Sequence, residues 1–569
     1  MTPAWAEDLF LAYPPAEHQT TADRIFLIGT ADPDRPVLVN GEAIEDRSTS
    51  GHFAPTVPLA MGENVLVLTQ GDANLTVRVT RITTTLALPA GASFLPDSLL
   101  PQVDMTRQVG EWVCFGAVAA PNAEVSVNWG NEAIALAPQP NAVELPPNSA
   151  VFTAQNEPVP LTTTSATAYK GCTVVPSTGA LGSPQYTINL DGQPVNQAAP
   201  GAIDRVVQPF QVAEVIVESG VARTGPSTNY SRITPLPQGT RAIVTGTEGD
   251  WLRLDYGGWI RASETQITTT TAPPRSIIRS VTSQQIPGWT EVRFPLQVPV
   301  PIGVEQTADT FTLTLHNTTP QTDTIFLNAD AAIERLDWIP ILPDKAQYRF
   351  QLRSNQQWGY KLRYEGTTLV LSLRHPPQQL TDRPLSGMTI LVDPGHGGEE
   401  LGARGPNGYP EKEMNLVVSK LLRTALEARG AMVVMTREGD ETVSLGDRID
   451  AINEVEPTLA LSIHYNALPD EGDALNTAGV GMFWYNAQAH SLAQFLHDRL
   501  VMTLDRPSDG VYWNNLALTR PTVAPSILLE LGFAINPYEF EWITNPDAQA
   551  ALAEEITNAI ELWVKKSVL

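Results

Sequence analysis

The sequence predicts a multidomain chain in which several all-β modules are followed by one α/β domain. Its 569 residues are far more than one hydrophobic core usually holds. The 47 prolines are spread along the first two-thirds, as short strands joined by many turns require. After Pro384, strand-like apolar runs alternate with helical spacing, which is typical of a mainly parallel sheet covered on both faces.

Composition excludes some classes of protein. Hydrophobic content of 42% and charged content of 17% fit globular domains. A net charge of −26 argues against nucleic acid as a partner, because phosphate binding needs clustered Lys and Arg. No apolar run approaches the roughly 18 residues that a transmembrane segment needs. Cys114 and Cys172 can form one disulfide or remain two buried thiols, and the sequence leaves both open.

The first β module is predicted over residues 18–85. Short apolar runs such as residues 24–29 read as strands, and the pair Asn40-Gly41 favours a tight hairpin turn. This segment resembles the immunoglobulin-like modules attached to many extracellular enzymes. A second β module is predicted over residues 105–205, where residues 123–130 echo the strand pattern of the first, so we expect two related sandwiches.

Two further β modules are expected before the α/β domain. Residues 210–267 combine short strands, Pro- and Gly-containing turns and the bulky Trp251 and Trp259, and this cadence resembles a bacterial SH3-like domain. Residues 268–274 read as a linker. Residues 276–378 alternate with period two, and they resemble the AMIN-type β domains that precede amidases in some cell-wall enzymes. A plain structural spacer is the alternative for this module.

The α/β domain is predicted over residues 386–569. The run at 388–393 is a buried strand that ends in a Gly-rich turn, and residues 411–429 have helical spacing stopped by Gly430. The remaining elements follow in alternation. Strands are expected at 431–435, 458–463, 480–485 and 526–531, and helices at 487–502 and 547–565.

Three predicted strands of this domain end in side chains that can bind metal or carry protons. In open α/β sheets, binding sites form where strands end and loops begin. His396 follows the first strand, His464 ends the third, and Glu530 ends the last, while Glu411 opens a helix. Taken singly, each histidine fits a structural role and Glu411 fits a helix start favoured by the helix dipole. Glu530 is the most telling, because a carboxylate on an apolar strand loses hydration unless it has a partner.

Together these four residues fit a catalytic zinc centre. Such a centre takes three protein ligands and keeps one position open, and two histidines with one carboxylate satisfy that rule. The metal makes a bound water acidic and polarises the scissile carbonyl. A second carboxylate is then needed to carry the proton to the leaving amine.

Residues 388–569 also resemble the zinc-dependent N-acetylmuramoyl-L-alanine amidases. The motifs that carry the resemblance are Asp393-Pro394-Gly395-His396-Gly397-Gly398, Gly402-Ala403-Arg404-Gly405, Glu411-Lys412, Thr436-Arg437, Leu445 with Arg448, Ser462-Ile463-His464-Tyr465-Asn466-Ala467 and Glu530-Leu531-Gly532-Phe533 with Asn536. The resemblance implies that His396, Glu411 and His464 bind Zn²⁺ and that Glu530 is the general base and acid.

Three other residues are weighed for roles at this site. Glu413 is a rival ligand, but residues two apart on a helix point about 200° apart, so it cannot replace Glu411. Asn466 is expected to position a ligand or substrate. Arg520 is expected either to hold a substrate carboxylate with its planar guanidinium or to form a surface ion pair.

The resemblance implies a hydrolase that cuts peptidoglycan between N-acetylmuramic acid and the first L-alanine of the stem peptide. The β modules would place the enzyme on the wall or on septal protein partners. The alternatives are a wall-binding scaffold with little or no catalysis and a zinc peptidase that cuts within the stem peptide. The substrate implies a periplasmic or extracellular location, although the N-terminus lacks the basic and apolar stretches of a secretory signal.

Overall fold

The computed structural model describes residues 9–82, 91–139, 143–146, 159–160, 166–206, 209–328, 332–378 and 381–568. The start of the chain, on which the prediction about a secretory signal depends, lies outside the described residues. Parts of the second predicted module, at 140–142, 147–158 and 161–165, lie outside them as well. Within the described residues, no helix has the length and apolar character needed to cross a membrane.

The first β module encloses its own apolar core, which includes Ile25, Leu68 and Val79. Its sheets are β1(Phe10–Tyr13)-β4(Ile28–Thr30)-β7(His52–Phe53), β2(Glu17–Thr20)-β10(Ala73–Arg81)-β9(Gly62–Gln70)-β5(Leu38–Val39)-β6(Glu42–Ala43) and β3(Arg24–Phe26)-β8(Thr56–Pro58). Asn40 and Gly41 have positive φ and join β5 to β6, which confirms the predicted hairpin turn. The module begins earlier than predicted, because β1 precedes residue 18 and pairs with β4.

A disulfide links Cys114 to Cys172 in the second β module, where the two residues face each other on adjacent strands. Its main sheet is β12(Trp112–Ala119)-β17(Thr167–Val174)-β14(Glu132–Pro138)-β13(Glu124–Trp129)-β18(Gln185–Leu190)-β19(Gln193–Ala198), beside the pair β15(Val143–Glu144)-β16(Val159–Pro160). Phe94 and Leu99 belong to its core, so the module begins before the predicted residue 105.

The third β module shares a sheet with the second. The order is β20(Ile203–Arg205)-β11(Met105–Arg107)-β24(Arg241–Glu248)-β21(Phe210–Val215)-β27(Thr265–Thr270), and β25(Trp251–Leu254) and β26(Trp259–Arg261) extend it from β24. The module also contains β22(Ser219–Gly220)-β23(Leu236–Pro237) and the 3-10 turn η2(Ala262–Glu264). Residues 268–270, predicted to start a linker, instead complete β27, because they pair with β21.

The fourth β module is a sandwich of two sheets. They are β32(Thr318–Phe326)-β28(Ser276–Ile286)-β29(Trp289–Pro295)-β36(Thr368–Arg374)-β35(Tyr360–Glu365) and β30(Ile302–Gln306)-β31(Thr310–Leu315)-β34(Lys345–Leu352)-β33(Ile333–Ile341). The predicted alternation is confirmed here, because Phe311, Leu313 and Leu315 all point into the core.

The C-terminal domain is built on one six-stranded sheet. Its order is β38(Met432–Met435)-β37(Thr389–Pro394)-β39(Leu459–Asn466)-β42(Ser526–Phe533)-β40(Val480–Trp484)-β41(Ser508–Trp513). Every neighbouring pair is parallel except β40 with β42. The helices and the 3-10 turn are α1(Glu411–Ala428), α2(Leu445–Val455), α3(Ala487–Thr503), η3(Ala517–Thr519), α4(Pro537–Ile543) and α5(Pro546–Val568).

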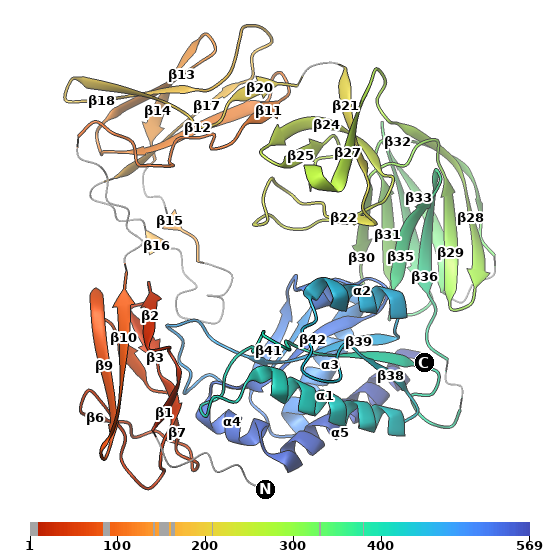
Figure 1. The fold of residues 1–569 in the computed structure, drawn as a ribbon. Coiled ribbons are helices and arrows are strands. Elements are labelled where there is room, and N and C mark those ends of the chain that lie inside the picture. The colour runs from red at the N-terminus through yellow and green to blue at the C-terminus, as the bar shows by residue number, and fades with distance from the viewer. Residues whose placement is uncertain are drawn as a thin grey trace.

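Helices cover both faces of this sheet. The face that bears Ile390 and Leu461 packs against α1, α3 and α5, and the face that bears Leu391 packs against α2 and η3. The ribbon shows the same two layers (Figure 1). The carboxyl ends of β37, β39 and β42 therefore meet at one edge of the sheet, which we call the carboxyl edge, and their starts meet at the amino edge.

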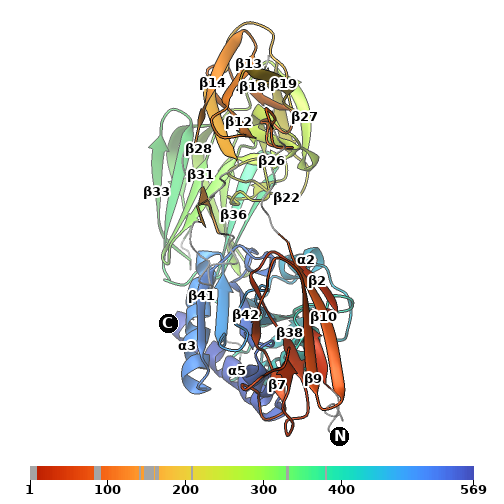
Figure 2. The same ribbon diagram turned by 90° about the vertical axis from the view of Figure 1, so that its left-hand side faces the viewer.

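The β modules contact the C-terminal domain at both of these edges. The first module docks beside the carboxyl edge through an apolar cluster that joins Phe26 and Ile28 to Phe533 and Ile535. The fourth module docks at the amino edge, where the Tyr360 amide donates to the Thr522 carbonyl over 2.8 Å. The first β module and the C-terminal domain therefore lie side by side, although they stand at opposite ends of the chain (Figures 1 and 2).

Candidate metal centre

Two histidines and one glutamate converge at the carboxyl edge. His396 Nε2 lies 3.1 Å from Glu411 Oε2, and His464 Nδ1 lies 3.0 Å from Glu411 Oε1. One nitrogen or oxygen from each of the three residues lies within 4.8 Å of the others. Ligands held about 2.1 Å from a tetrahedral zinc stand about 3.4 Å apart, so this spacing fits such an ion.

The Gly-rich turn after β37 sets the position of His396. His396 has φ of +61°, a left-handed conformation that non-glycine residues seldom adopt. A Cβ on Gly395 would lie 2.2 Å from the His464 ring, and one on Gly402 would lie 2.4 Å from Glu411 Oε2. Only glycine therefore lets this turn approach the two other residues so closely.

Glu411 is the first residue of α1, and its carboxylate is buried among donors. Oε1 accepts from the Tyr465 amide at 3.1 Å and from Asn415 Nδ2 at 3.1 Å, and Oε2 accepts from the Ala403 amide at 2.9 Å. Burial alone would raise the pKa of this carboxyl, but its hydrogen bonds with both histidines hold that pKa well below its usual range. The carboxylate is thus ionised and oriented, as a metal ligand must be.

The second ring nitrogen of His396, Nδ1, also has a partner. It lies 3.0 Å from Glu400 Oε1. Burial lowers the pKa of His396, but contacts with Glu411 and Glu400 outweigh that effect and raise it. Metal-binding histidines commonly donate a hydrogen bond from their second ring nitrogen to a carboxylate, which fixes the orientation and tautomer of the ring.

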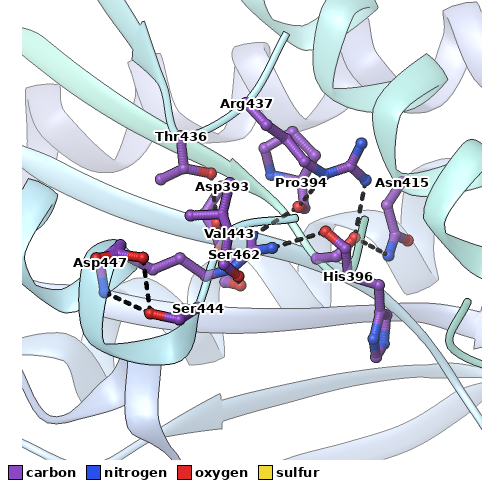
Figure 3. A network of polar contacts seen from close by, with 12 residues as sticks. Asp393, Pro394, His396, Asn415, Thr436, Arg437, Val443, Ser444, Asp447 and Ser462 are labelled. Carbon is purple, nitrogen blue, oxygen red and sulfur yellow. Dashed lines mark hydrogen bonds and ion pairs between the residues drawn. The ribbon is translucent and has the colours of Figure 1, made fainter. Parts of the chain in front are cut away.

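A buried polar network anchors the turn that carries His396 (Figure 3). Asp393 pairs with Arg448 and accepts from Ser462 Oγ at 2.6 Å and Thr436 Oγ1 at 2.5 Å. Arg448 Nη2 donates to the His396 carbonyl at 2.6 Å, and Arg437 Nη2 donates to the Gly395 carbonyl at 2.9 Å. Two buried guanidiniums thereby hold the backbone on either side of the strained residue.

Glu530 lies beside this cluster on β42, where its Cα is in register with that of His464. Its Oε2 is buried and has no hydrogen-bond partner among the described residues. Burial, together with the negative charges of Glu411 and Asp509, raises the pKa of Glu530 well above its ordinary value. Burial and the charge of Glu539 also raise the pKa of Asp509, to about 6.

The structure brings together four of the six predicted site residues, and Asn466 lies at the same edge of the sheet, whereas Arg520 lies elsewhere. Asn466 lies two residues beyond His464 on β39, and its Oδ1 accepts from the Ala467 amide. Arg520 is not at this site, because it follows η3 and precedes β42, so it emerges at the amino edge. Its guanidinium donates to Asn515 Oδ1 at 2.8 Å, and it forms no ion pair within the described residues.

Sequence reasoning gave no role to Asp393, Arg437, Arg448 or Asp509. Asp393 carries the same signal as Glu530, since it is a carboxylate at the end of an apolar strand and must find a partner. The partner itself could not be found from the sequence, because Arg448 is 55 residues away on α2. Asp509 precedes a glycine on an outer strand and carries no such signal.

The first β module borders this site. A cavity of about 780 Å³ opens between the two and is lined by Phe10, Tyr13 and Val77 from the module and by Ala403 and Leu468 from the C-terminal domain. The loop after β39 joins them, because Asp470 accepts from the Tyr13 hydroxyl and lies 2.9 Å from His18 Nε2.

Residues 390–562 match the family model of N-acetylmuramoyl-L-alanine amidases. The probable cell wall amidase LytH of Staphylococcus epidermidis is 34% identical over 188 residues, which cover 33% of this chain and 62% of that protein. LytH of Staphylococcus aureus is 33% identical over 182 residues, which cover 32% and 60%. The chain therefore spans about three-fifths of the length of these curated relatives.

Solved structures of amidases align with about a third of the chain. The amidase AmiC2 of Nostoc punctiforme is 27% identical with a TM-score of 0.30, and the match covers 32% of this chain and 99% of that one. An N-acetylmuramoyl-L-alanine amidase from Clostridium difficile 630 is 31% identical with a TM-score of 0.30, covering 31% and 97%.

Proposed function

We propose that this chain hydrolyses the amide bond between N-acetylmuramic acid and the first L-alanine of the stem peptide in peptidoglycan. One observation carries the proposal. His396, Glu411, His464 and Glu530 converge at one edge of the sheet, within the residues that match the amidase family model. A scaffold would have no need to bury two carboxylates side by side, since their repulsion and lost hydration cost stability.

In this proposal His396 Nε2, Glu411 and His464 Nδ1 would hold a zinc ion, which would supply Lewis acidity toward the scissile carbonyl and the attacking water. Glu530 accepts the proton of the attacking water on its carboxylate. It passes that proton to the amide nitrogen of L-alanine as the carbon–nitrogen bond breaks, and with the second proton of the water also moving to the amine, the products are a lactyl carboxylate and a peptide ammonium group.

Arg437 and Arg448 orient the metal ligands, and Asn466 orients the substrate. Arg437 and Arg448 act through the backbone carbonyls of Gly395 and His396, so they position the ligands without contacting substrate. Asn466 has no hydrogen bond to its Nδ2 within the described residues, and we assign that donor to the substrate. A peptidase that cuts inside the stem peptide would use the same residues, so only the products distinguish the two enzymes.

We assign the β modules to wall targeting. Immunoglobulin-like modules at 18–85 and 105–205, an SH3-like domain at 210–267 and an AMIN-like domain at 276–378 would precede the zinc amidase domain at 386–569. The proposed substrate places the protein in the periplasm or at the extracellular cell wall, with wall or septal proteins as further partners.

The experiment compares Glu530→Gln with wild type on purified peptidoglycan, with digests analysed by mass spectrometry. Wild type should release free stem peptides and leave bare glycan, whereas Glu530→Gln should bind zinc normally and turn over about 10²- to 10⁴-fold more slowly. Glu413→Gln, on the same helix as Glu411 but outside the cluster, is the matched control and should behave as wild type. Peptide fragments still attached to sugar would identify the peptidase instead.

A further inference from the structure

A second cleft lies at the amino edge, where three domains meet. It measures about 970 Å³ and is lined by the third β module, the fourth β module and the C-terminal domain. A volume of this size suits a ligand as large as a small oligosaccharide. His396, Glu411 and His464 do not line it.

The C-terminal domain contributes an aromatic platform to this cleft. Trp513 ends β41 and stacks on Tyr485 with ring centroids 5.2 Å apart and an angle of 28° between the planes. Trp513 Nε1 donates to the Tyr485 carbonyl at 2.9 Å, which fixes the pair. Trp513 is nevertheless 61% exposed. Aromatic faces carry partial negative charge, and the slightly positive C–H groups of a pyranose ring pack against them.

Positive charge without acidic partners faces the same space. Arg232 from the third module and Arg520 both line the cleft, and neither forms an ion pair within the residues that the structure describes. Burial and the charges of Arg232 and Arg223 lower the pKa of Arg520 to about 10. Lys345 also lines the cleft, and the exposed Glu305 is an acidic residue on its wall. In a chain of net charge −26, two unpaired guanidiniums in one cleft indicate an anionic ligand.

The walls of the cleft are tied together by hydrogen bonds between domains. The Val304 amide donates to Thr234 Oγ1 at 2.8 Å, which joins the fourth module to the third. Tyr360 donates through its amide to Thr522, and Gln306 Nε2 reaches Gln488 Oε1 at 3.3 Å, which joins the fourth module to the C-terminal domain. A cleft preassembled in this way loses little entropy on binding.

We propose that this cleft binds an amino-sugar glycan that carries free carboxylates, with sugar rings on Trp513 and Tyr485 and carboxylates on Arg232 and Arg520. Guanidiniums bind carboxylates through two parallel hydrogen bonds. The proposal rests on the proposed function, because cutting the muramoyl amide frees one carboxylate on each muramic acid. The cleft would therefore recognise glycan whose stem peptides have been removed, and it would hold the chain on regions that it has already processed.

The test measures binding of full-length Glu530→Gln protein to three probes. They are glycan strands stripped of peptide, neutral chitin oligosaccharides of the same length, and free stem peptides. Stripped glycan should bind at least about tenfold more tightly than chitin oligosaccharide, since charge-assisted contacts are the stronger ones. Replacing both arginines, Arg232→Gln with Arg520→Gln, should remove this preference. Trp513→Ala should weaken both sugar probes, and because Trp513 is exposed this change leaves the core intact.

Arg241→Gln is the matched control, because Arg241 belongs to the third module but pairs with Glu214 outside the cleft. It should bind all probes like the parent protein. Equal binding of stripped glycan and chitin, unchanged binding by both the double variant and Trp513→Ala, or preferential binding of stem peptides would each overturn the proposal. The two proposals fail separately. Preferential glycan binding without release of stem peptides would refute only the proposed function. Release of stem peptides without a preference for stripped glycan would refute only the proposal about the cleft.

Discussion

The two edges of the C-terminal sheet are built from the same strands but differ in construction. At the carboxyl edge, carboxylates and histidines are packed within one domain, and buried arginines hold their backbone. At the amino edge, the exposed Trp513 stacks on Tyr485, and two arginines that form no ion pair within the described residues face a cleft whose walls come from three domains. Catalysis needs atoms placed within tenths of an ångström, which a strand-end site in a single core supplies. Recognition of a polymer tolerates looser placement, which docked domains can supply.

The two edges also differ in how deeply their polar side chains are buried. The Asp393–Arg448 pair is almost fully buried and holds the turn that carries His396. Arg520 is only half-buried and, within the part of the chain that the structure describes, its guanidinium donates to Asn515 alone. The carboxyl edge therefore depends on each partner of its network, whereas the amino edge should tolerate substitution without loss of fold. Four substitutions test this difference, and they are given in order of decreasing expected effect.

Glu411→Gln should abolish the metal centre while sparing the amino edge. A neutral amide oxygen is a much weaker zinc ligand than a carboxylate, so we expect loss of bound zinc and of all measurable release of stem peptide. Elemental analysis and peptidoglycan digestion measure the two effects, and glycan binding should remain that of the parent. Retention of stoichiometric zinc would show that Glu411 is not a ligand.

Arg448→Met should destabilise the C-terminal domain by about 3–5 kcal/mol, because it leaves Asp393 buried without its cation. The unfolding transition of this domain in urea measures the change. Lys565→Met is the control, since Lys565 makes an exposed helical ion pair with Glu561 and should change stability by about 0.5 kcal/mol or less. Equal effects of the two substitutions would contradict the positioning role of the buried pair.

Asp509→Asn should shift the acid limb of the activity profile to lower pH. Glu530 must be deprotonated to accept a proton, and the charge of Asp509 helps to raise its pKa. Removing that charge lowers the pKa of Glu530, so the variant should keep more of its maximal activity on the acid side. The pH dependence of kcat/KM measures the shift. A limb that moves to higher pH would mean that Asp509 acts on the site in another way.

Asp470→Asn should have the smallest effect. It weakens the polar contact of the first module with Tyr13 and His18 but leaves the apolar cluster around Phe26 and Phe533 intact. We expect the free energy that holds the first module against the C-terminal domain to fall by about 1 kcal/mol, as measured by hydrogen exchange in β1. A loss of several kcal/mol would show that this polar contact, and not apolar packing, holds the module beside the metal centre.

Much of the candidate site could be predicted because strand ends are visible in the sequence. His396, His464 and Glu530 each end an apolar run, and parallel strands bring such ends to one edge. Arg520 shows the limit of this reasoning. It is a polar residue close to a strand, but it precedes β42, and the position of a residue before or after its strand decides which edge it reaches. Module boundaries were less accurate, because β1, Phe94 and residues 268–270 join sheets or cores through distant pairings.

Sequence patterns predicted the order of β modules and α/β domain, the residues able to form a metal centre, and the strands and helices of that domain except β41 and α4. These features follow from local periodicity and from side-chain chemistry, which neighbouring residues carry. Three features could be learned only from the folded chain: Arg448 pairs with Asp393, the first module borders the metal centre, and three domains enclose a cleft around Arg232 and Arg520. Such contacts join residues tens to hundreds of positions apart, so they depend on the packing of whole faces and not on any local pattern.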